Sequence, residues 1–404
     1  MARKQGLGMD TLTAARQRTA WSLSTFPRVY VSFSGGKDSS VLLHIAAEEA
    51  RRQNKKIGVL FVDLEGQYKL TIDHVREMME LYADCIEPFW AALPLHLRNA
   101  VSVFEPHWTC WEPGRESDWV RPAPPEAIMA PDYFPFFRAG MEFEEFVPAF
   151  GHWYGQGQPT ACLVGIRADE SLNRHRTINN SGWKSCFEGR PWTTWCGSSL
   201  YNVYPIYDWN VTDIWTYAGK FGAVYNRLYD RMHLAGLSLA QMRICQPYGD
   251  DQRKGLWLFH LIEPETWARV VARVAGANGG ALYSQESGNI NGVRLITKPP
   301  GHTWESFATT LLESQPPQTR HHYENKIAVF LHWWSLRGYP QGIPDEADPA
   351  EEATKKTPSW RRVCKSLLRN DYWCKGLSFT QQKSTAYDAY TKVMKNRRKK
   401  WNIF

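Results

Sequence analysis

Residues 29–41 read VYVSFSGGKDSSV and predict a strand, a glycine turn and the first turn of a helix. β-Branched and aromatic residues favour a buried strand before the turn, and apolar residues with helical spacing follow it. Glycines let backbone amides approach a ligand, and the unpaired amides at a helix start attract anions. This pattern predicts a phosphate cradle formed by Ser34, Gly35, Gly36, Lys37, Asp38, Ser39 and Ser40. The alternative is a tight strand-to-helix turn with a serine cap.

A second buried strand is predicted over residues 57–62, and it ends at an acidic turn that contains Asp63 and Glu65. Strand, helix and strand in this order imply a right-handed βαβ unit in a parallel sheet. Ligands bind at the carboxyl ends of the strands in such sheets. Asp63 and Glu65 are therefore candidates for contacts with ribose, adenine or Mg²⁺, and the alternative is an ordinary solvated strand end.

A third motif follows the buried strand predicted over residues 160–166. Arginines at a strand's carboxyl end can pair with phosphate or sulfate in a bidentate manner, and neighbouring carboxylates can orient them or hold a metal ion. The alternative is a salt-bridge cluster on the surface. The candidate residues of this motif are Gly165, Arg167, Asp169, Glu170 and Arg174.

Residues 93–159 are rich in proline and tryptophan, and we expect them to form an insertion that is irregular apart from a helix near residues 143–153. An insertion of this length inside a compact domain is usually functional, as a lid or a specificity wall. Cys110 lies within it, but no base at a defined spacing accompanies this cysteine, so we expect a buried structural thiol. Further along, Asn210 or Thr212 is expected to cap a helix that ends near Phe221.

The composition fits a chain of one large or two ordinary domains, with 404 residues and 43% hydrophobic residues. Neither an apolar run of membrane-spanning length nor a signal-peptide core is apparent, so we expect a cytoplasmic protein without a membrane segment. The eight cysteines contain no C-x-x-C pair, which argues against a zinc ribbon or a local iron–sulfur motif. The 19 tryptophans are explained by packing or, alternatively, by base stacking.

The positive charge is concentrated at the C-terminal end. Residues 351–404 contain 14 Lys and Arg against 4 Asp and Glu, a net charge of +10, which leaves −3 for the rest of the +7 chain. Six of these positive charges fall within residues 392–400. The segment is either a solubilising tail or a contact for the phosphate backbone of nucleic acid or for an acidic partner.

The SGGxDS pattern at residue 34 resembles the PP-loop of the ATP pyrophosphatase superfamily. Within that superfamily the chain resembles the phosphoadenosine-phosphosulfate (PAPS) reductase-like branch, because a Gly-x-Arg-x-x-Glu-Ser segment begins at Gly165 and an N-x-L-Y turn begins at Asn226. End to end it is similar to bacterial IbrA/YbdN-type proteins. The resemblance implies an α/β parallel-sheet PP-loop domain over residues 1–250. Amphipathic patterns beyond it predict a mainly helical region with a basic tail over residues 251–404.

The resemblance also implies ATP or an adenylyl sulfonucleotide as ligand, Mg²⁺ held by Asp38 and Asp63, and catalytic roles for Lys37, Asp38 and Arg167. Sulfonucleotide reductases attack with a cysteine in a C-terminal Glu-Cys-Gly-x-His motif, and neither Cys364 nor Cys374 has that context. We therefore expect ATP pyrophosphatase or adenylyl-transfer chemistry at an anionic substrate. The alternative is a nucleotide-sensing or nucleic-acid-associated protein that acts with a ParB/sulfiredoxin-like partner.

Overall fold

The chain forms two compact units in the computed structural model, Met1–Gln285 and Glu286–Phe404. The structure describes residues 6, 8–99, 107–179, 186–244, 255–274, 277, 296–314, 317–368, 371 and 374–379. The predicted division lay near residue 250, and the first unit continues past it through helices α8 (Leu256–Ile262) and α9 (Pro264–Arg273). The basic segment 392–400 and Cys245 lie outside the described residues.

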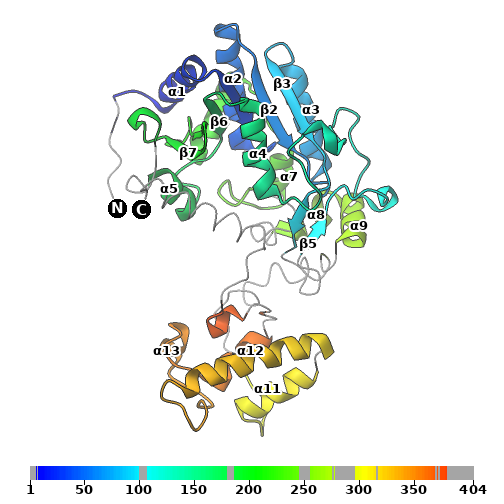
Figure 1. Ribbon diagram of the computed structural model, residues 1–404, viewed down its shortest axis with the longest axis vertical. Coiled ribbons are helices and arrows are strands. Elements are labelled where there is room, and N and C mark those ends of the chain that lie inside the picture. Colours follow the sequence, from blue (N-terminus) through cyan, green and yellow to red (C-terminus); the bar gives the residue numbers. More distant parts are fainter. Residues whose placement is uncertain are drawn as a thin grey trace. The chain divides into compact units, whose positions relative to one another are not determined.

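A six-stranded sheet forms the centre of the first unit (Figure 1). Its strand order is β3-β2-β1-β6-β8-β7, and only the edge strand β7 runs antiparallel to its neighbour. This confirms the predicted α/β class with a largely parallel sheet, whose carboxyl edge gathers the turns after β1, β2 and β6. The strands are β1 (Arg28–Ser32), β2 (Ile57–Val62), β3 (Ile86–Ala91), β6 (Thr160–Val164), β7 (Thr193–Gly197) and β8 (Leu200–Val203).

Helices cover both faces of the sheet because its strands are apolar on both sides. Val31 and Val59 face one core with helices α1 (Thr11–Thr25), α2 (Lys37–Arg52), α3 (Lys69–Leu81) and α6 (Val211–Phe221). Tyr30 and Leu60 face the other core with α4 (Phe143–Gly155), α7 (Leu228–Leu234), α8 and α9. Asn210 caps α6 in a capping box with Asp213, which decides between the two predicted caps.

The insertion after β3 is more regular than the sequence indicated. It contains an antiparallel hairpin of β4 (His96–Arg98) and β5 (His107–Thr109), the short 3-10 helices η1 (Glu116–Asp118) and η2 (Pro131–Tyr133), and the predicted helix α4. Phe134, which follows η2, and Trp153 of α4 pack edge to face with ring centroids 5.1 Å apart. They belong to a larger aromatic cluster that packs against α4. Packing therefore accounts for the aromatic richness of this part of the chain.

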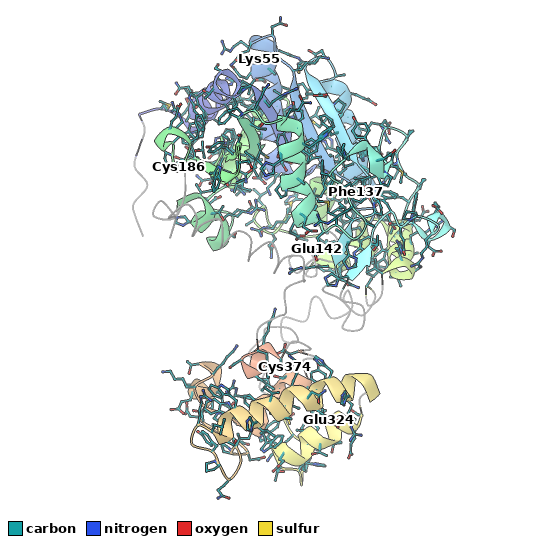
Figure 2. All side chains as sticks on the ribbon, viewed as in Figure 1. Lys55, Phe137, Glu142, Cys186, Glu324 and Cys374 are labelled. Carbon is teal, nitrogen blue, oxygen red and sulfur yellow. The ribbon has the colours of Figure 1, made fainter. Side chains whose placement is uncertain are left out.

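The second unit is helical, as predicted, with α11 (Trp304–Glu313), α12 (Pro317–Ser335), α13 (Pro349–Ala353) and α14 (Trp360–Leu368), followed by a short 3-10 helix, η5 (Lys375–Leu377). Residues 338–358 are rich in proline and acidic residues, but they pack into this unit and do not form a linker, because Arg361 pairs with Glu346 and Glu352 and Ile343 joins the core. Figure 2 shows Cys374 among the side chains of this unit. No helix among the described residues is both long and apolar enough to span a bilayer.

Candidate functional site

The predicted cradle is a tightly hydrogen-bonded turn between β1 and α2. The hydroxyls of Ser39 and Ser40 both donate to the Gly36 carbonyl, at 3.0 and 2.9 Å, and the Ser34 and Ser39 hydroxyls lie 2.9 Å apart. Gly35 has a φ of +71°, and a Cβ there would lie 2.9 Å from Thr71 Cγ2. Gly36 is the N-cap of α2 and provides no capping side chain. The helix therefore starts without a cap from its own N-cap side chain, which suits it to bind an anion.

Two side chains hold the cradle in place, one from the turn before α7 and one from the first turn of α7. Asn226 is fully buried, and its side-chain amide donates to the Gly35 carbonyl and to Thr71 Oγ1, each at 3.0 Å. The Tyr229 hydroxyl accepts from the Lys37 amide at 3.0 Å. The sequence signalled this turn only through its resemblance to an N-x-L-Y segment and gave these residues no role at the cradle.

The structure brings Lys37, Asp38 and Arg167 together. Lys37 Nζ lies 3.1 Å from one oxygen of Asp38 and donates to the Met242 carbonyl at 3.2 Å, and the other oxygen of Asp38 pairs with Arg167. Arg167 also pairs with Asp169, and although burial opposes its charged form, Asp38 raises its pKa. Lys37 and Arg167 are only 4% and 3% exposed. These residues therefore do not form a salt-bridge cluster on the surface.

Gly165 explains how Arg167 reaches the cradle. A Cβ on Gly165 would lie 2.9 Å from the Ser39 backbone and 3.0 Å from the Asp38 carbonyl carbon. Only a residue without a side chain lets the turn after β6 pack this closely against the start of α2. Gly165 thus contributes to the site through close packing between two backbone segments.

Glu170 and Arg174, the remaining charged residues of the arginine motif, pair with each other. Arg174 pairs with Glu170 at 2.9 Å and its side chain is 40% exposed. Arg243, which the sequence analysis did not single out, donates to the Glu170 carbonyl at 2.5 Å. Since Arg243 directly follows Met242, the segment that binds Lys37 also contacts the turn after β6. No motif in the sequence marks this contact.

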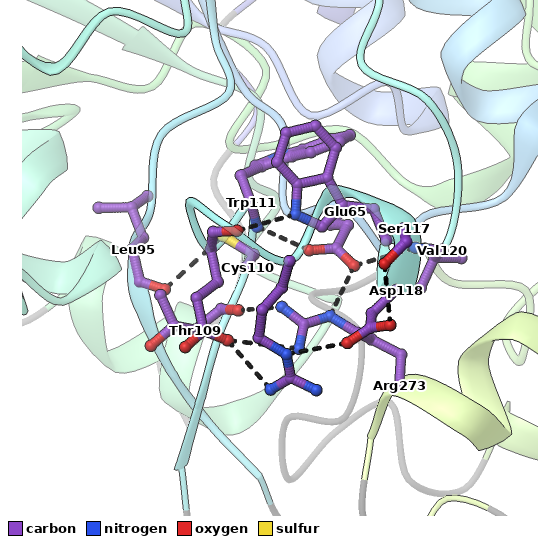
Figure 3. Close-up of polar contacts among 12 residues, drawn as sticks. Glu65, Leu95, Thr109, Cys110, Trp111, Ser117, Asp118, Val120 and Arg273 are labelled. Carbon is purple, nitrogen blue, oxygen red and sulfur yellow. Dashed lines mark hydrogen bonds and ion pairs between the residues drawn. The ribbon is translucent and has the colours of Figure 1, made fainter.

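Asp63 and Glu65 are fully buried and form a network with the insertion and α9. Figure 3 shows the part of this network around Glu65 and Arg273. Asp63 accepts from Trp90 Nε1 at 2.9 Å, from the Glu65 amide at 3.0 Å and from Arg121. Glu65, with a φ of +63°, accepts from the amides of Trp111 and Val120 and pairs with Arg273 at 3.0 Å. The interpretation of these two acids as a solvated strand end is therefore wrong.

The fit of the predicted magnesium ligands differs between the two aspartates. Among the described residues, no three His, Cys, Asp or Glu side chains form a group that could hold a metal ion. Asp63 already accepts from Arg121, Trp90 and the Glu65 amide, so it has little capacity for a cation. Asp38 lies at the cradle, and Mg²⁺ commonly uses one or two carboxylates together with substrate phosphates. Asp38 is therefore the better placed of the two, although a metal that arrives with a nucleotide would share this carboxylate with Lys37 and Arg167.

The thiols of Cys110, Cys364 and Cys374 do not have the environment of nucleophiles. Cys110 is fully buried, its thiol donates to the Leu93 and Leu95 carbonyls, and burial raises its pKa. Burial also raises the pKa of Cys364 and of Cys374 to about 12. A reactive cysteine needs a lowered pKa and access to solvent. This agrees with the structural role expected for Cys110.

His74 supports the cradle from α3 and gives it a predictable response to pH. Its Nε2 lies 2.7 Å from Ser40 Oγ, which donates to Gly36, and burial followed by the nearby His44 lowers its pKa to about 4. In the unfolded chain His74 binds a proton near pH 6.5, whereas in the folded chain His74 binds it only near pH 4. We therefore expect the free energy of unfolding to decrease as the pH falls from about 6.5 to about 4.

The contribution of one such proton is about 1.4 kcal/mol per pH unit within this window. Urea unfolding of the wild type and of His74→Gln at pH 7 and pH 5 measures it. The variant should lose less stability between the two pH values than the wild type, and an equal loss in both would contradict the assignment. His44, whose pKa is also lowered by burial, is unchanged in the variant and accounts for a remaining slope.

Comparison with known proteins places these features in a class. A family model described as "Phosphoadenosine phosphosulfate reductase domain" matches residues 28–91 and 151–242, which include the cradle and the arginine motif. A second model, described as "Domain of unknown function (DUF3440)", matches residues 236–341 and 340–387. Residues 28–242, which contain the cradle and the arginine motif, are thus similar to a PAPS reductase domain.

The particular family follows from a full-length relative. The chain is 47% identical over 399 residues to the uncharacterized protein YbdN of Escherichia coli (strain K12), covering 98% of this chain and 97% of the relative. It belongs to the same family as YbdN.

Similar solved structures include a PAPS reductase from Candida auris, with 15% identity, a TM-score of 0.29 and coverage of 56% of this chain and 86% of that chain. An FMN adenylyltransferase from Candida glabrata has 16% identity, a TM-score of 0.30 and coverage of 54% and 57%. The U34-tRNA thiolase NcsA from Methanococcus maripaludis has 11% identity, a TM-score of 0.32 and coverage of 74% and 88%.

Proposed function

We propose that this protein binds ATP in its PP-loop and transfers the adenylyl group to an anionic acceptor. The observation that carries the proposal is the meeting of Lys37, Asp38 and Arg167 at the start of α2. In this reaction an acceptor oxygen attacks the α-phosphorus, the bond to the β-phosphate breaks and pyrophosphate leaves. With water as the acceptor, the same chemistry is ATP pyrophosphatase activity.

Each group of residues in the site has a separate role in this reaction. The cradle amides and hydroxyls hold the pyrophosphate portion, and Lys37 and Arg167 offset the charge that develops on it. Both cations already lie in place on Asp38, so little reorganisation accompanies the reaction. Mg²⁺, which would supply further charge neutralisation, would enter with the nucleotide and use Asp38 as its protein ligand. Glu170 orients Arg174 for an anion of the second substrate.

Release of pyrophosphate tests whether the protein is an enzyme or a sensor. Only the enzyme releases pyrophosphate from ATP, whereas a sensor that acts through a ParB/sulfiredoxin-like partner or through nucleic acid binds the nucleotide unchanged. The buried pairing of both cations with Asp38 favours the enzyme. Binding of ATP without any pyrophosphate, in the presence of sulfate, nucleoside phosphates and tRNA as acceptors, would favour the sensor.

Arg167→Lys provides a specific test of the anion-binding role. Lysine keeps the charge but not the planar fork that joins Asp38 and Asp169. We expect nucleotide affinity or turnover to fall at least tenfold, while the unfolding temperature changes little. Arg16→Lys is the matched control. Arg16 pairs with Glu48, the side chains of both residues are 47% exposed, and neither residue has a part in the proposed site. Equal behaviour of the two variants in ATP titrations would contradict the assignment.

Sulfonucleotide reduction should be absent. Cys364 and Cys374 are buried, and their raised pKa keeps both thiols protonated at neutral pH. We expect no sulfite from PAPS with thioredoxin or dithiothreitol as the thiol donor, in an assay where an authentic reductase produces it. Sulfite formation that is lost in Cys364→Ser or Cys374→Ser would show that one of these cysteines is the nucleophile.

A further inference from the structure

Arg121 is a largely buried arginine, with a side chain 13% exposed, whose hydrogen-bonding capacity the described part of the protein leaves partly unused. Its Nη2 pairs with Asp63, but its Nε and Nη1 are buried and have no hydrogen-bond partner among the described residues. A guanidinium stays protonated in proteins, so it cannot avoid this situation by losing its charge. Each unpaired buried donor loses its hydrogen bonds to water without replacement, which destabilises the folded chain. An acceptor at these two positions would remove that destabilisation.

Arg273 shows what a satisfied arginine looks like in the same network. Its Nε donates to Glu65 at 3.0 Å, its Nη2 donates to the Thr109 carbonyl at 2.7 Å, and its Nη1 lies 3.5 Å from Glu112. All three of its nitrogens thus face an oxygen of the protein. The two arginines differ in this respect although they serve adjacent acids of one turn.

The acids beside Arg121 cannot satisfy its free donors. Asp63 already accepts from Trp90, from the Glu65 amide and from Arg121 itself. Glu65 accepts from two backbone amides and from Arg273. The missing acceptor must therefore come from outside this network.

Neighbouring contacts fix the position of Arg121, which lies near the carboxyl edge of the sheet, where the cradle is. The Val120 amide donates to Glu65 at 3.0 Å, and the Arg121 guanidinium lies over the Trp111 ring, 5.0 Å from its centroid. Asp63 directly follows β2, the parallel neighbour of β1, whose own carboxyl end leads into the cradle. Neighbouring strands lie about 4.8 Å apart, so the two turns adjoin.

We propose that Arg121 binds an oxyanion of the second substrate, a carboxylate, phosphate or sulfate group, and thereby determines which acceptor is used. The proposal deepens the proposed function and rests on it. The free donors suit oxyanions because charge-assisted hydrogen bonds from arginine are about twice as strong as neutral ones. Arg167, by contrast, already pairs with two carboxylates, and Arg174 pairs with one. The insertion that carries Arg121 thus acts as the specificity wall.

The experiment titrates the full chain with inorganic sulfate and inorganic phosphate at constant ionic strength, by calorimetry. It uses wild-type protein saturated with a non-hydrolysable ATP analogue and, separately, a Gly36→Val background in which the cradle is blocked. Arg121→Lys keeps one bond to Asp63 and loses the fork, and we expect at least a tenfold weaker affinity for one of the anions. Its affinity for the ATP analogue should stay within twofold of wild type.

Arg273→Lys is the control, because it disturbs the same network at an arginine whose donors are already used. It should leave both anion affinities unchanged even where it lowers the unfolding temperature. Equal anion affinities in wild type and Arg121→Lys, or no saturable binding of either anion, would overturn the proposal and assign the free donors to water. Failure of the ATP analogue to bind wild type would instead overturn the proposed function, and the Gly36→Val titration would still report on Arg121.

Because Arg121→Lys could fold poorly, the double variant Arg121→Met/Asp63→Asn provides a second test. It removes both charges of the buried pair together, so no unpaired charge remains. The double variant should also lose the anion affinity by at least tenfold. Retention of that affinity in a folded double variant would contradict the role of Arg121.

Discussion

Replacement of Gly36 by valine should abolish nucleotide binding while leaving the fold intact. Gly36 has a φ of −83° and a ψ of 161°, an extended conformation that valine adopts readily. A Cβ there would lie 3.3 Å from Ser34 Oγ and 3.5 Å from the Tyr229 hydroxyl. The two further methyl groups of valine would then occupy the space above the cradle amides. We expect the Kd for ATP to rise at least 100-fold, which corresponds to about 2.7 kcal/mol.

Two other glycines, Gly219 and Gly35, define the controls for this experiment. Gly219→Val changes an exposed position on α6 with no atom within 4 Å of the added Cβ, so ATP affinity should not change. Gly35→Val is a contrasting case, because its φ of +71° and a 2.9 Å contact with Thr71 would strain the backbone and reduce stability. Isothermal titration and circular dichroism separate loss of binding from loss of folding. Wild-type affinity in Gly36→Val would refute the cradle assignment.

The sequence predicted the sheet and the cradle because both depend on local patterns. Buried strands appear as short β-branched runs, and the turn at Gly35 depends on its own glycines, so a window of a dozen residues contains the signal. Arg167 was also accessible to sequence analysis, because in a parallel sheet the ends of β1 and β6 meet at one edge. The shared sheet edge did not, however, predict that Asp38 would pair with both Lys37 and Arg167 in one buried cluster.

The contacts that the sequence did not reveal all join residues far apart in the chain. Tyr229 accepts from Lys37 across 192 positions, and Met242 accepts from it across 205. No periodicity or spacing encodes such pairs, since they depend on how α7 and the following segment pack on the sheet. The same reason explains why the buried network of Asp63 and Glu65 was not predicted. Their pattern indicated a ligand-binding turn, whereas their partners lie in the insertion and in α9.

Arg273→Met should produce the largest loss of stability of any variant considered for this protein. The Glu65 and Arg273 side chains are 0% and 2% exposed, and the substitution would leave the Glu65 carboxylate buried with two backbone amides but without a counter-charge. Breaking a buried ion pair by removing one partner costs about 3–5 kcal/mol. For a unit of this size that corresponds to a decrease in unfolding temperature on the order of 10 °C.

Arg51→Met provides the matched control, because Arg51 forms an equally well-aligned pair with Asp84 whose side chains are 43% and 59% exposed. Exposed pairs contribute about 0–1 kcal/mol, so this variant should lower the unfolding temperature by only a few degrees. Adding Glu65→Gln to Arg273→Met removes the unpaired charge and should recover part of the loss. Differential scanning calorimetry of the four proteins decides the matter. Equal shifts for Arg273→Met and Arg51→Met would mean that the network does not hold α9 and the insertion against the turn after β2, and the fixed position of Arg121 would then lose its physical basis.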